Sequence, residues 1–330
     1  MNYEKFGNTD LIVSKIGFGA WGIGGPAMAG SVPIGWGNVD DNISISALKK
    51  SFDLGVTFYD TADFYGLGHS EELIGKVFGN SKEVIIATKV GHRLDENNSI
   101  FLDYSYKHII DACEKSLQRL NRDYIDLYQL HSAKLEHLEK GECIKAMEDL
   151  QKQGKIRYWG LSLNTFNPFP EAEYLFNNNL GNSFQLVFNI LNQRAITIVE
   201  RAKLNGFGII ARMPLQFGLL TGKFNKFSKF EKNDHRSFRL NEHIIETTLN
   251  ELENIWFLTE KYNTNKTGLS LSFIAAISGI NTIIPGIKTE IQAVDNCTNL
   301  VQLEDKDITL IKNLYNEKFE YIVSLMEKQG

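Results

Sequence analysis

Residues 56–66 read VTFYDTADFYG, a short apolar run that ends in a carboxylate and continues into a loop with a tyrosine. Side-chain alternation places Val56, Phe58 and Asp60 on one side of the predicted strand. A carboxylate at the end of an apolar strand is costly to bury without a partner. The next β-rich run, EVIIATK at 83–89, places Lys89 on the matching face. The two runs therefore predict an ion pair between Asp60 and Lys89, with a purely structural or a functional role equally open.

Working outward, short β-rich runs alternate with amphipathic helical runs along the chain. The predicted strands cover 14–20, 56–60, 83–89, 124–131, 156–162, 184–189, 208–214 and 281–286. This alternation is typical of a parallel sheet whose faces are covered by crossover helices. Eight such units predict an α/β fold of the (β/α)8 TIM-barrel type, with an open doubly wound sheet as the alternative.

The position of the polar residues favours the barrel. Five predicted strands carry a polar residue at their C-terminal ends: Asp60, Lys89, His131, Ser162 and Arg212. In a barrel all these ends converge on one mouth, where active sites are built, whereas an open sheet spreads them along an edge.

The remaining segments fit one domain that covers residues 1–330. YEKFGNTDLIVS at 3–14 predicts an N-terminal β-hairpin that caps the barrel bottom. The Gly-rich loop 22–40 and the region 215–262 extend the mouth, and a helical tail is expected over about 304–328. No Pro-, Gly- or Ser-rich linker marks a second domain.

Composition excludes several functional classes. A net charge of −5 with scattered basic residues argues against a nucleic-acid partner. The sequence has no apolar run of the roughly 20 residues that cross a bilayer and no secretory signal pattern at its start, so we expect a cytoplasmic protein without a membrane partner. The three cysteines and the histidines are dispersed, so no metal is predicted. Oligomeric state is open.

The hexapeptide GFGAWG at 17–22 satisfies the G-x-G-x-x-G pattern, and Asp40 and Asp41 follow it. A dinucleotide-binding fingerprint of this kind requires a helix to begin within the motif. Here glycines and prolines follow instead, so the Rossmann interpretation is disfavoured. We interpret Asp40 and Asp41 as N-terminal capping residues of a helix that begins near Ile43.

Tyr65 and His131 complete a chemically sensible group with Asp60 and Lys89. Tyr65 lies on the loop just past Asp60, and His131 ends the fourth strand. A lone loop tyrosine or a lone histidine is more often a packing residue. Together, however, a neighbouring ammonium is expected to lower the pKa of the tyrosine, and Asp60 to keep Lys89 charged and in place.

These residues resemble the aldo-keto reductase superfamily, whose members are (β/α)8 barrels that reduce carbonyls with NADPH. The resemblance runs from KFGNTDLIVSKIGFGAWG through FYDTADFYGLGHSEELIGK, VIIATK, YIDLYQLH and WGLS to PLQFGLLTGK and IIPGIKTEIQAVDN. It implies an oxidoreductase in which hydride from the nicotinamide reaches the carbonyl carbon of an aldehyde or ketone. It also implies Asp60, Tyr65, Lys89 and His131 as catalytic residues, with Tyr65 as general acid and His131 orienting the carbonyl.

The resemblance also implies a set of binding residues. For the cofactor they are Gly19, Ala20, Trp21, Asp60, Ser162, Asn164, Gln185, Arg212, Pro214, Leu215, Gly218, Leu219, Lys223, Lys288, Gln292, Asp295 and Asn296. Trp21, Tyr65 and His131 are the implied contacts for a small carbonyl substrate. Lys288 favours NADPH/NADP+ over NADH.

The chain departs from the family pattern at two of these places. The usual GVSNF appears as GLSLNTF, so Asn164 is a doubtful substitute for an asparagine expected at Leu163. Arg212 stands where many members carry an aromatic residue that stacks on the nicotinamide.

Three other functions stay open at this stage. A reductase of a nucleotide-linked keto-deoxy-sugar would also suit Arg212 and the long loop 22–40. A barrel lyase or aldolase could use Lys89 as a Schiff-base amine, although pairing with Asp60 argues against it. A weakly catalytic, NADPH-binding redox sensor would keep the cofactor site but turn over slowly.

Overall fold

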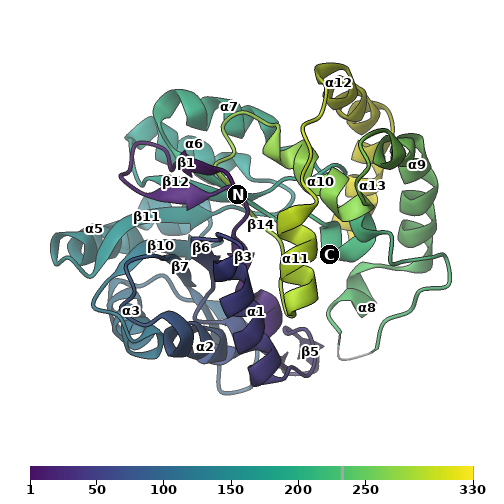
Figure 1. The fold of residues 1–330 in the computed structure, drawn as a ribbon. Helices are drawn as coiled ribbons and strands as arrows, with labels where there is room; N and C mark the ends of the chain where they lie inside the picture. The colour runs from purple at the N-terminus through teal and green to yellow at the C-terminus, as the bar shows by residue number, and fades with distance from the viewer. Residues whose placement is uncertain (232–233, 330) are drawn as a thin grey trace.

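The computed structural model, which describes residues 1–231 and 234–329, contains a sheet of eight parallel strands (Figure 1). The strands are β3 (Phe18–Gly19), β6 (Phe58–Asp60), β7 (Ile85–Val90), β10 (Ile125–His131), β11 (Ile156–Ser162), β12 (Ser183–Val187), β13 (Gly208–Arg212) and β14 (Thr282–Ile284). Single bridges from Ile16 to Ile283 and from Gly19 to Gly286 join the two outermost strands. The sheet therefore closes into a (β/α)8 barrel, and the predicted fold class is confirmed.

The predicted strands match the barrel strands in order and number, but three of them are clearly shorter than expected. The second, expected over 56–60, covers Phe58–Asp60, and the last, expected over 281–286, covers Thr282–Ile284. The first strand, expected over 14–20, is confined to Phe18–Gly19. A 3₁₀ turn, η1 (Ala20–Ile23), begins directly after it. The chain thus bends away from the barrel wall at GFGAWG, and no long helix begins there.

Alternation along the strands fills the inside of the barrel. An apolar layer contains Phe58, Ala87, Leu127 and Ile210, one residue from each of four strands. The next inward position along each of these strands is Asp60, Lys89, Gln129 or Arg212. The interior therefore changes from apolar to polar toward the carboxyl ends of the strands, which is where barrel active sites lie.

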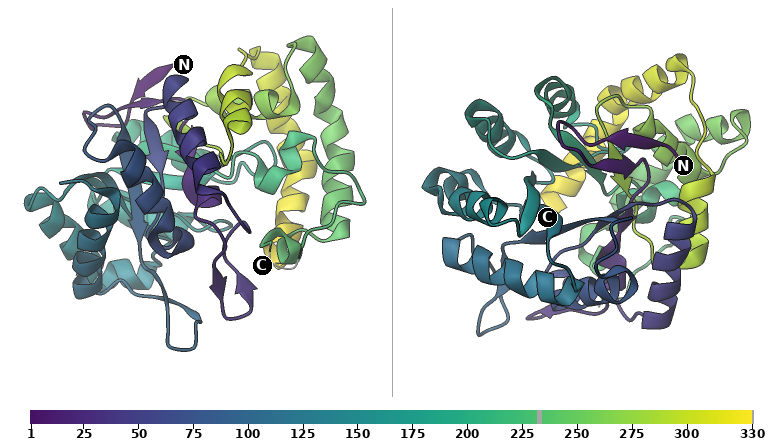
Figure 2. Two further views of the ribbon diagram at one scale, coloured as in Figure 1. Left: turned by 60° about the horizontal axis from the view of Figure 1, so that its bottom comes forward. Right: turned by 60° about the vertical axis from the view of Figure 1, so that its left-hand side comes forward.

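An antiparallel hairpin closes the opposite end of the barrel, as predicted. Strands β1 (Tyr3–Lys5) and β2 (Ile12–Ser14) pair there, and Phe6 at their connection is completely buried. Two further hairpins, β4–β5 (Met28–Ala29, Val32–Pro33) and β8–β9 (His92–Leu94, Ile100–Leu102), project from the other end (Figure 2). The mouth is thus walled by loops and the bottom is sealed.

The helices surround the sheet. They are α1 (Asp41–Asp53), α2 (His69–Phe78), α3 (Tyr106–Leu120), α4 (Leu135–Lys140), α5 (Glu142–Lys152), α6 (Phe169–Asn178), α7 (Ile196–Asn205), α8 (Arg236–Arg239), α9 (Glu242–Lys261), α10 (Lys266–Ala275), α11 (Glu290–Thr298), α12 (Asp305–Leu314) and α13 (Glu320–Gln329). The expected tail is helical but is divided by a π-helical turn at Tyr315–Phe319.

The start of helix α1 differs from the expectation that both Asp40 and Asp41 are capping residues. The helix begins at Asp41, and Asp40 alone is its N-cap, accepting hydrogen bonds from the backbone of Asn42 and Ile43. Asp41 lies within the first turn and contacts His69 at 2.9 Å instead. An acidic side chain in the first helical turn is favourable because it faces the positive end of the helix dipole.

The expected extension over 215–262 contains a turn, η3 (Gln216–Thr221), followed by α8 and most of α9. Residues 232–233 within it, and residue 330 of the expected single domain, lie outside the described residues. Among the described helices, none is long and apolar enough to cross a membrane. In the same residues, no group of three His, Cys, Asp or Glu side chains is placed to hold a metal ion.

The contact between α2 and α3 generates a stability prediction. A Cβ atom on Gly75 would lie 2.2 Å from the carbonyl oxygen of Arg119. Alanine in place of helical glycine normally stabilises by about 0.5–1 kcal/mol. Here the backbone clash should outweigh that gain, so Gly75→Ala is expected to lower the free energy of unfolding by about 1–3 kcal/mol in urea denaturation. Lys76→Ala, an exposed change on the same helix, is the control, and a Gly75→Ala protein at least as stable as the control contradicts the prediction.

Candidate active site

A buried ion pair lies at the centre of the barrel mouth. The Lys89 Nζ donates to Asp60 Oδ2 at 2.6 Å, and the two side chains are 0% and 2% exposed. In the sheet register the partner of Asp60 is Ala87, two residues before Lys89. The long side chain of Lys89 spans this offset and contacts the carboxylate. The pairing that the alternation predicted is therefore present.

The carboxylate and the ammonium are fully engaged by neighbours. The side-chain amides of Gln129 and Gln185 donate to Asp60 Oδ1 at 3.2 and 2.6 Å. Lys89 also donates to the carbonyl of Thr61 at 2.8 Å. Burial lowers the pKa of Lys89, but Asp60 and Tyr65 together outweigh this effect, and the net pKa is raised. Lys89 is thus held charged, which removes the free amine that a Schiff-base lyase requires.

Tyr65 is turned toward this pair by the loop that follows β6. Its hydroxyl lies 3.3 Å from Lys89 Nζ. The next residue, Gly66, has φ of +61°, and a Cβ there would lie 1.9 Å from the carbonyl oxygen of Gly24, so only glycine fits. Burial raises the pKa of Tyr65 and outweighs the opposing effect of Lys89. The expectation that Lys89 lowers this pKa below its ordinary value is therefore wrong for this structure.

Two histidines stand beside Tyr65. The ring of His131 meets that of Tyr65 edge-on at 5.8 Å, and the ring of His92 lies 4.2 Å from His131. Burial lowers the pKa of His131 well below its usual range, with His92 contributing. Burial together with Lys89 lowers the pKa of His92 to about 4. Both imidazoles are neutral at neutral pH, and His92 is a neighbour that the sequence interpretation missed.

These residues open into a cavity of about 640 Å³. Of the residues predicted from the family resemblance, these line it: Gly19, Ala20, Trp21, Asp60, Tyr65, His131, Ser162, Gln185, Arg212, Pro214, Leu215, Gly218, Lys223, Lys288 and Gln292. Lys89 lies beneath the cavity floor, behind Asp60 and Tyr65. The size is within the range of about 300–1,000 Å³ that is usual for small-molecule and cofactor sites.

Besides Lys89, four predicted residues lie outside the cavity lining. Asn164 is exposed, and its Oδ1 accepts hydrogen bonds from the backbone N–H groups of Phe166 and Asn167. Leu219 is buried in the core at 1% exposure. Asp295 accepts from Asn265 and Asn299, and Asn296 is buried on the same helix.

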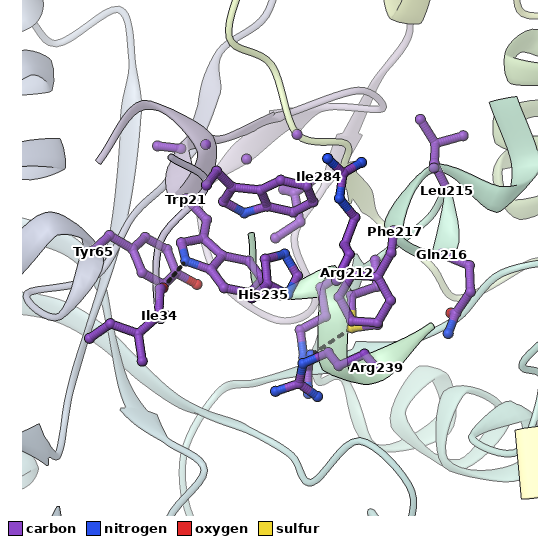
Figure 3. Close-up of a pocket in the computed structure, with 18 of the residues that line it drawn as sticks. Trp21, Ile34, Tyr65, Arg212, Leu215, Gln216, Phe217, His235, Arg239 and Ile284 are labelled. Carbon is purple, nitrogen blue, oxygen red and sulfur yellow. Dashed lines mark hydrogen bonds between the residues drawn. The ribbon is translucent and has the colours of Figure 1, made fainter. Parts of the chain in front are cut away.

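An aromatic wall, formed by Trp21, Trp36, Phe217 and His235, lines one side of the cavity. Trp21 stacks on Tyr65 at 6.0 Å and meets His235 in a tilted contact at 4.6 Å, and its indole N–H donates to the carbonyl of Ile34 (Figure 3). Trp36 and Phe217 meet His235 at 4.3 and 5.1 Å. Only Trp21 was predicted. The others come from the two mouth segments, whose approach to each other has no local sequence signal.

The cavity is strongly cationic. Its charged lining consists of Arg212, Lys223, Arg236, Arg239 and Lys288, with Asp60 as the only carboxylate among the described lining residues. Asp60 is already paired with Lys89, and Arg236 with Asp234. The positive charge of the other lining residues suits an anionic ligand, although the chain as a whole has a net charge of −5.

Comparison with known proteins adds independent information. The sequence model of the Aldo/keto reductase family matches residues 15–316. The aldo-keto reductase YhdN of Bacillus subtilis is 30% identical over 338 aligned residues, 96% of each chain. The solved structure of aldo-keto reductase AKR11C1 from Bacillus halodurans in its holo form is similar, with a TM-score of 0.78, 26% identity and coverage of 95% of this chain and 96% of that one. The glycerol dehydrogenase AKR11B4 from Gluconobacter oxydans has a TM-score of 0.79 at 25% identity, covering 96% and 95%.

Other relatives differ in the cofactor that their names state. The aldo-keto reductase yakc [NADP(+)] of Schizosaccharomyces pombe is 30% identical over 318 residues, 94% of this chain and 90% of that protein. The NADH-specific methylglyoxal reductase of Escherichia coli is 26% identical over 330 residues, 95% and 98% of the two chains. Similarity to these proteins points to a nicotinamide cofactor without choosing between its two forms.

The buried ion pair generates a prediction. Asp60→Asn leaves the ammonium of Lys89 buried without a counter-charge, which should lower the free energy of unfolding by about 3–5 kcal/mol at neutral pH. The double variant Asp60→Asn/Lys89→Met removes both charges and should recover much of this loss. Asp10→Asn, which breaks an exposed ion pair with Arg157, should change stability by less than about 1 kcal/mol.

The pH dependence gives a second readout of the same variant. In the natural protein the raised pKa of Lys89 contributes stability that is present below its unfolded pKa and lost as pH rises through the folded one. In Asp60→Asn the folded pKa should instead be depressed, so stability should rise with pH between neutrality and the unfolded value. Urea titrations at several pH values measure this slope, and a slope like that of the natural protein contradicts the prediction.

Proposed function

Because this chain belongs to the aldo/keto reductase family, we propose that it is an NADPH-dependent reductase that converts an aldehyde or a ketone to the alcohol, with Tyr65 as the general acid. The observation that carries the proposal is the meeting of Asp60, Lys89, Tyr65 and His131 at the barrel mouth, with Lys89 Nζ hydrogen-bonded to both Asp60 and the Tyr65 hydroxyl. Family membership by itself supports the broader statement that the protein is an oxidoreductase.

The lining residues fit a nicotinamide dinucleotide. Lys223 and Lys288 provide partners for phosphates, and Ser162 and Gln185 line the same cavity with polar groups suited to a carboxamide. When bound, this cofactor supplies the hydride that reduces the carbonyl carbon. Gln185 donates one amide hydrogen to Asp60, which leaves its carbonyl oxygen to accept from a ligand.

Tyr65 is suited to give a proton to the carbonyl oxygen. Its raised pKa keeps the phenol protonated at neutral pH before the reaction. As the proton leaves, negative charge develops on the phenolate, and the ammonium of Lys89 at 3.3 Å stabilises it. The ion pair with Asp60 holds that ammonium in position, so the charge is stabilised by a group that needs no reorganisation.

His131 serves a different purpose. Because its pKa lies well below the usual range, the imidazole is neutral at neutral pH and is a poor proton source. A neutral ring can still donate one N–H hydrogen bond. We therefore assign to His131 the orientation of the carbonyl toward Tyr65, and proton transfer to Tyr65 itself.

The preference for NADPH rests on Lys288. This side chain lines the cavity together with Arg236 and Gln292. The oxygen of the Gln292 side chain accepts the backbone N–H of Lys288 at 2.7 Å, which positions the start of α11. Arg236 is paired with Asp234, so Lys288 is the cation that we assign to a phosphate monoester, the group that distinguishes NADPH from NADH.

The first experiment tests the proton donor. Tyr65→Phe removes the acidic hydroxyl and keeps the ring, so turnover of aldehydes should fall by about 10²- to 10⁴-fold while the dissociation constant for NADPH stays nearly unchanged. Steady-state NADPH oxidation measures the first quantity and fluorescence titration the second. Tyr158→Phe, near the sealed end of the barrel, is the control. Retained turnover in Tyr65→Phe would contradict the assignment of Tyr65 as the general acid.

The second experiment tests the cofactor preference. Lys288→Met keeps the aliphatic stem that packs over Gly22 and removes the charge. Loss of a charge-assisted hydrogen bond should weaken NADPH binding by about 10- to 100-fold. NADH binding should change little. Asp40→Asn and Asp41→Asn should leave NADPH affinity unchanged, and an equal loss for NADPH and NADH would refute the role of Lys288.

A further inference from the structure

The cations of the cavity fall into two electrostatic groups. Burial lowers the pKa of Lys288, and Arg236 adds to the effect. Burial likewise lowers the pKa of Arg212; Tyr65 and Asp60 oppose this effect, and Arg239 adds to it. Arg212 lines the cavity together with Tyr65 and His131, the residues proposed to contact the carbonyl.

The position of Arg212 follows from the barrel. It ends β13 at the next inward position after Ile210, and its register partner on β14 is Ile284. Barrel closure brings this end of β13 to the same mouth as Asp60 and His131. Arg239 reaches the cavity from α8, in the mouth segment, with its guanidinium 5.8 Å from the ring of Phe217; both arginines can be followed in Figure 3.

The hydrogen bonds of Arg212 fix its guanidinium without neutralising it. One terminal nitrogen donates to the carbonyl of Leu163 at 3.1 Å and to the hydroxyl of Thr165 at 3.0 Å, and the other contacts the sulfur of Met213 at 3.3 Å. The Nε atom is buried and has no hydrogen-bond partner within the described chain. No carboxylate of the residues described pairs with this arginine.

We propose that Arg212, assisted by Arg239, binds an anionic oxygen group on the substrate, so that the substrates are carbonyl compounds that carry a carboxylate or a phosphate. This inference rests on the proposed reductase function and assigns a substrate class to the same cavity. This assignment replaces the cofactor contact that the family resemblance implies for Arg212. The side chain contacts the substrate away from the reacting carbonyl and determines specificity.

The physical reason is the missing counter-charge. Arg212 is partly buried, its hydrogen-bond acceptors are neutral, and the nearby Asp60 is already paired with Lys89. Such a cation keeps part of its desolvation cost, and an incoming anion offsets that cost. Guanidinium also binds carboxylate and phosphate in a planar, two-pronged geometry that a point charge lacks. The aromatic wall lines the same cavity and offers an apolar surface to the body of such a substrate.

The test compares matched pairs of probes that differ only in charge. The first pair is 4-carboxybenzaldehyde and methyl 4-formylbenzoate, and the second is glyceraldehyde 3-phosphate and glyceraldehyde. Affinity is measured by calorimetry on the full chain saturated with NADP+, and turnover is measured separately with NADPH. The variants are Arg212→Met, Arg212→Lys and Arg239→Met, with Arg201→Met, an arginine on α7 paired with Glu173, as the control.

We expect the natural protein to bind at least one anionic member about 10- to 100-fold more tightly than its neutral partner. Arg212→Met should abolish this preference and leave NADP+ affinity within about threefold, whereas Arg212→Lys should retain part of it. Arg239→Met should reduce the preference less, and Arg201→Met should not alter it. Which pair shows the preference decides between carboxylate and phosphate.

Two results would overturn the inference. One is equal affinity for both members of each pair in the natural protein. The other is an Arg212→Met variant in which NADP+ affinity falls as much as probe affinity, because Arg212 then serves the cofactor. Failure of the reductase function looks different. Charge-selective binding without turnover of any probe would refute the reductase and leave the anion site standing.

Discussion

The buried contact between Asp60 and Lys89 is the interaction on which the rest of the site depends. Lysine has three donors, and here they reach Asp60, the Thr61 carbonyl and the Tyr65 hydroxyl. The desolvation free energy of a buried ammonium is offset only when such partners are present. The same requirement that keeps the ammonium paired in the barrel therefore also holds the phenol at the mouth, so stability and chemistry share one arrangement.

The barrel turns a simple alternation of side chains into a layered interior. Phe58, Ala87, Leu127 and Ile210 make an apolar layer, and the residues two positions further along these strands are polar. Because every strand runs in the same direction, all of these polar ends meet at one mouth. Barrel closure also brings Arg212 toward Tyr65, although 146 positions separate them in the chain.

The walls of the cavity come from loops that are held in strained conformations. Met213, Gln216 and Phe217 have positive φ angles, which are uncommon outside glycine. The Asn189 side chain donates to the carbonyl of Met213 at 2.9 Å and to the Gln216 side chain at 2.7 Å, which supports this backbone path. Such strain persists where surrounding contacts over-determine the conformation and is concentrated at ligand-binding sites. The loop that carries Phe217 is thus positioned by the barrel rather than by its own sequence.

The sequence by itself determined the barrel and the pairing of Asp60 with Lys89, because these follow from a period of two residues and from the cost of an unpaired charge. Short-range patterns also placed Tyr65 and His131 near this pair, whereas the contacts of Asp60 with Gln129 and Gln185 came from the tertiary structure. Only the tertiary structure decided the direction of the Tyr65 pKa, since burial depends on what covers the ring. It likewise decided that Asn164 turns away from the cavity and that Trp36 and His235 line it. These outcomes depend on contacts between segments distant in the chain, for which no local spacing carries a signal.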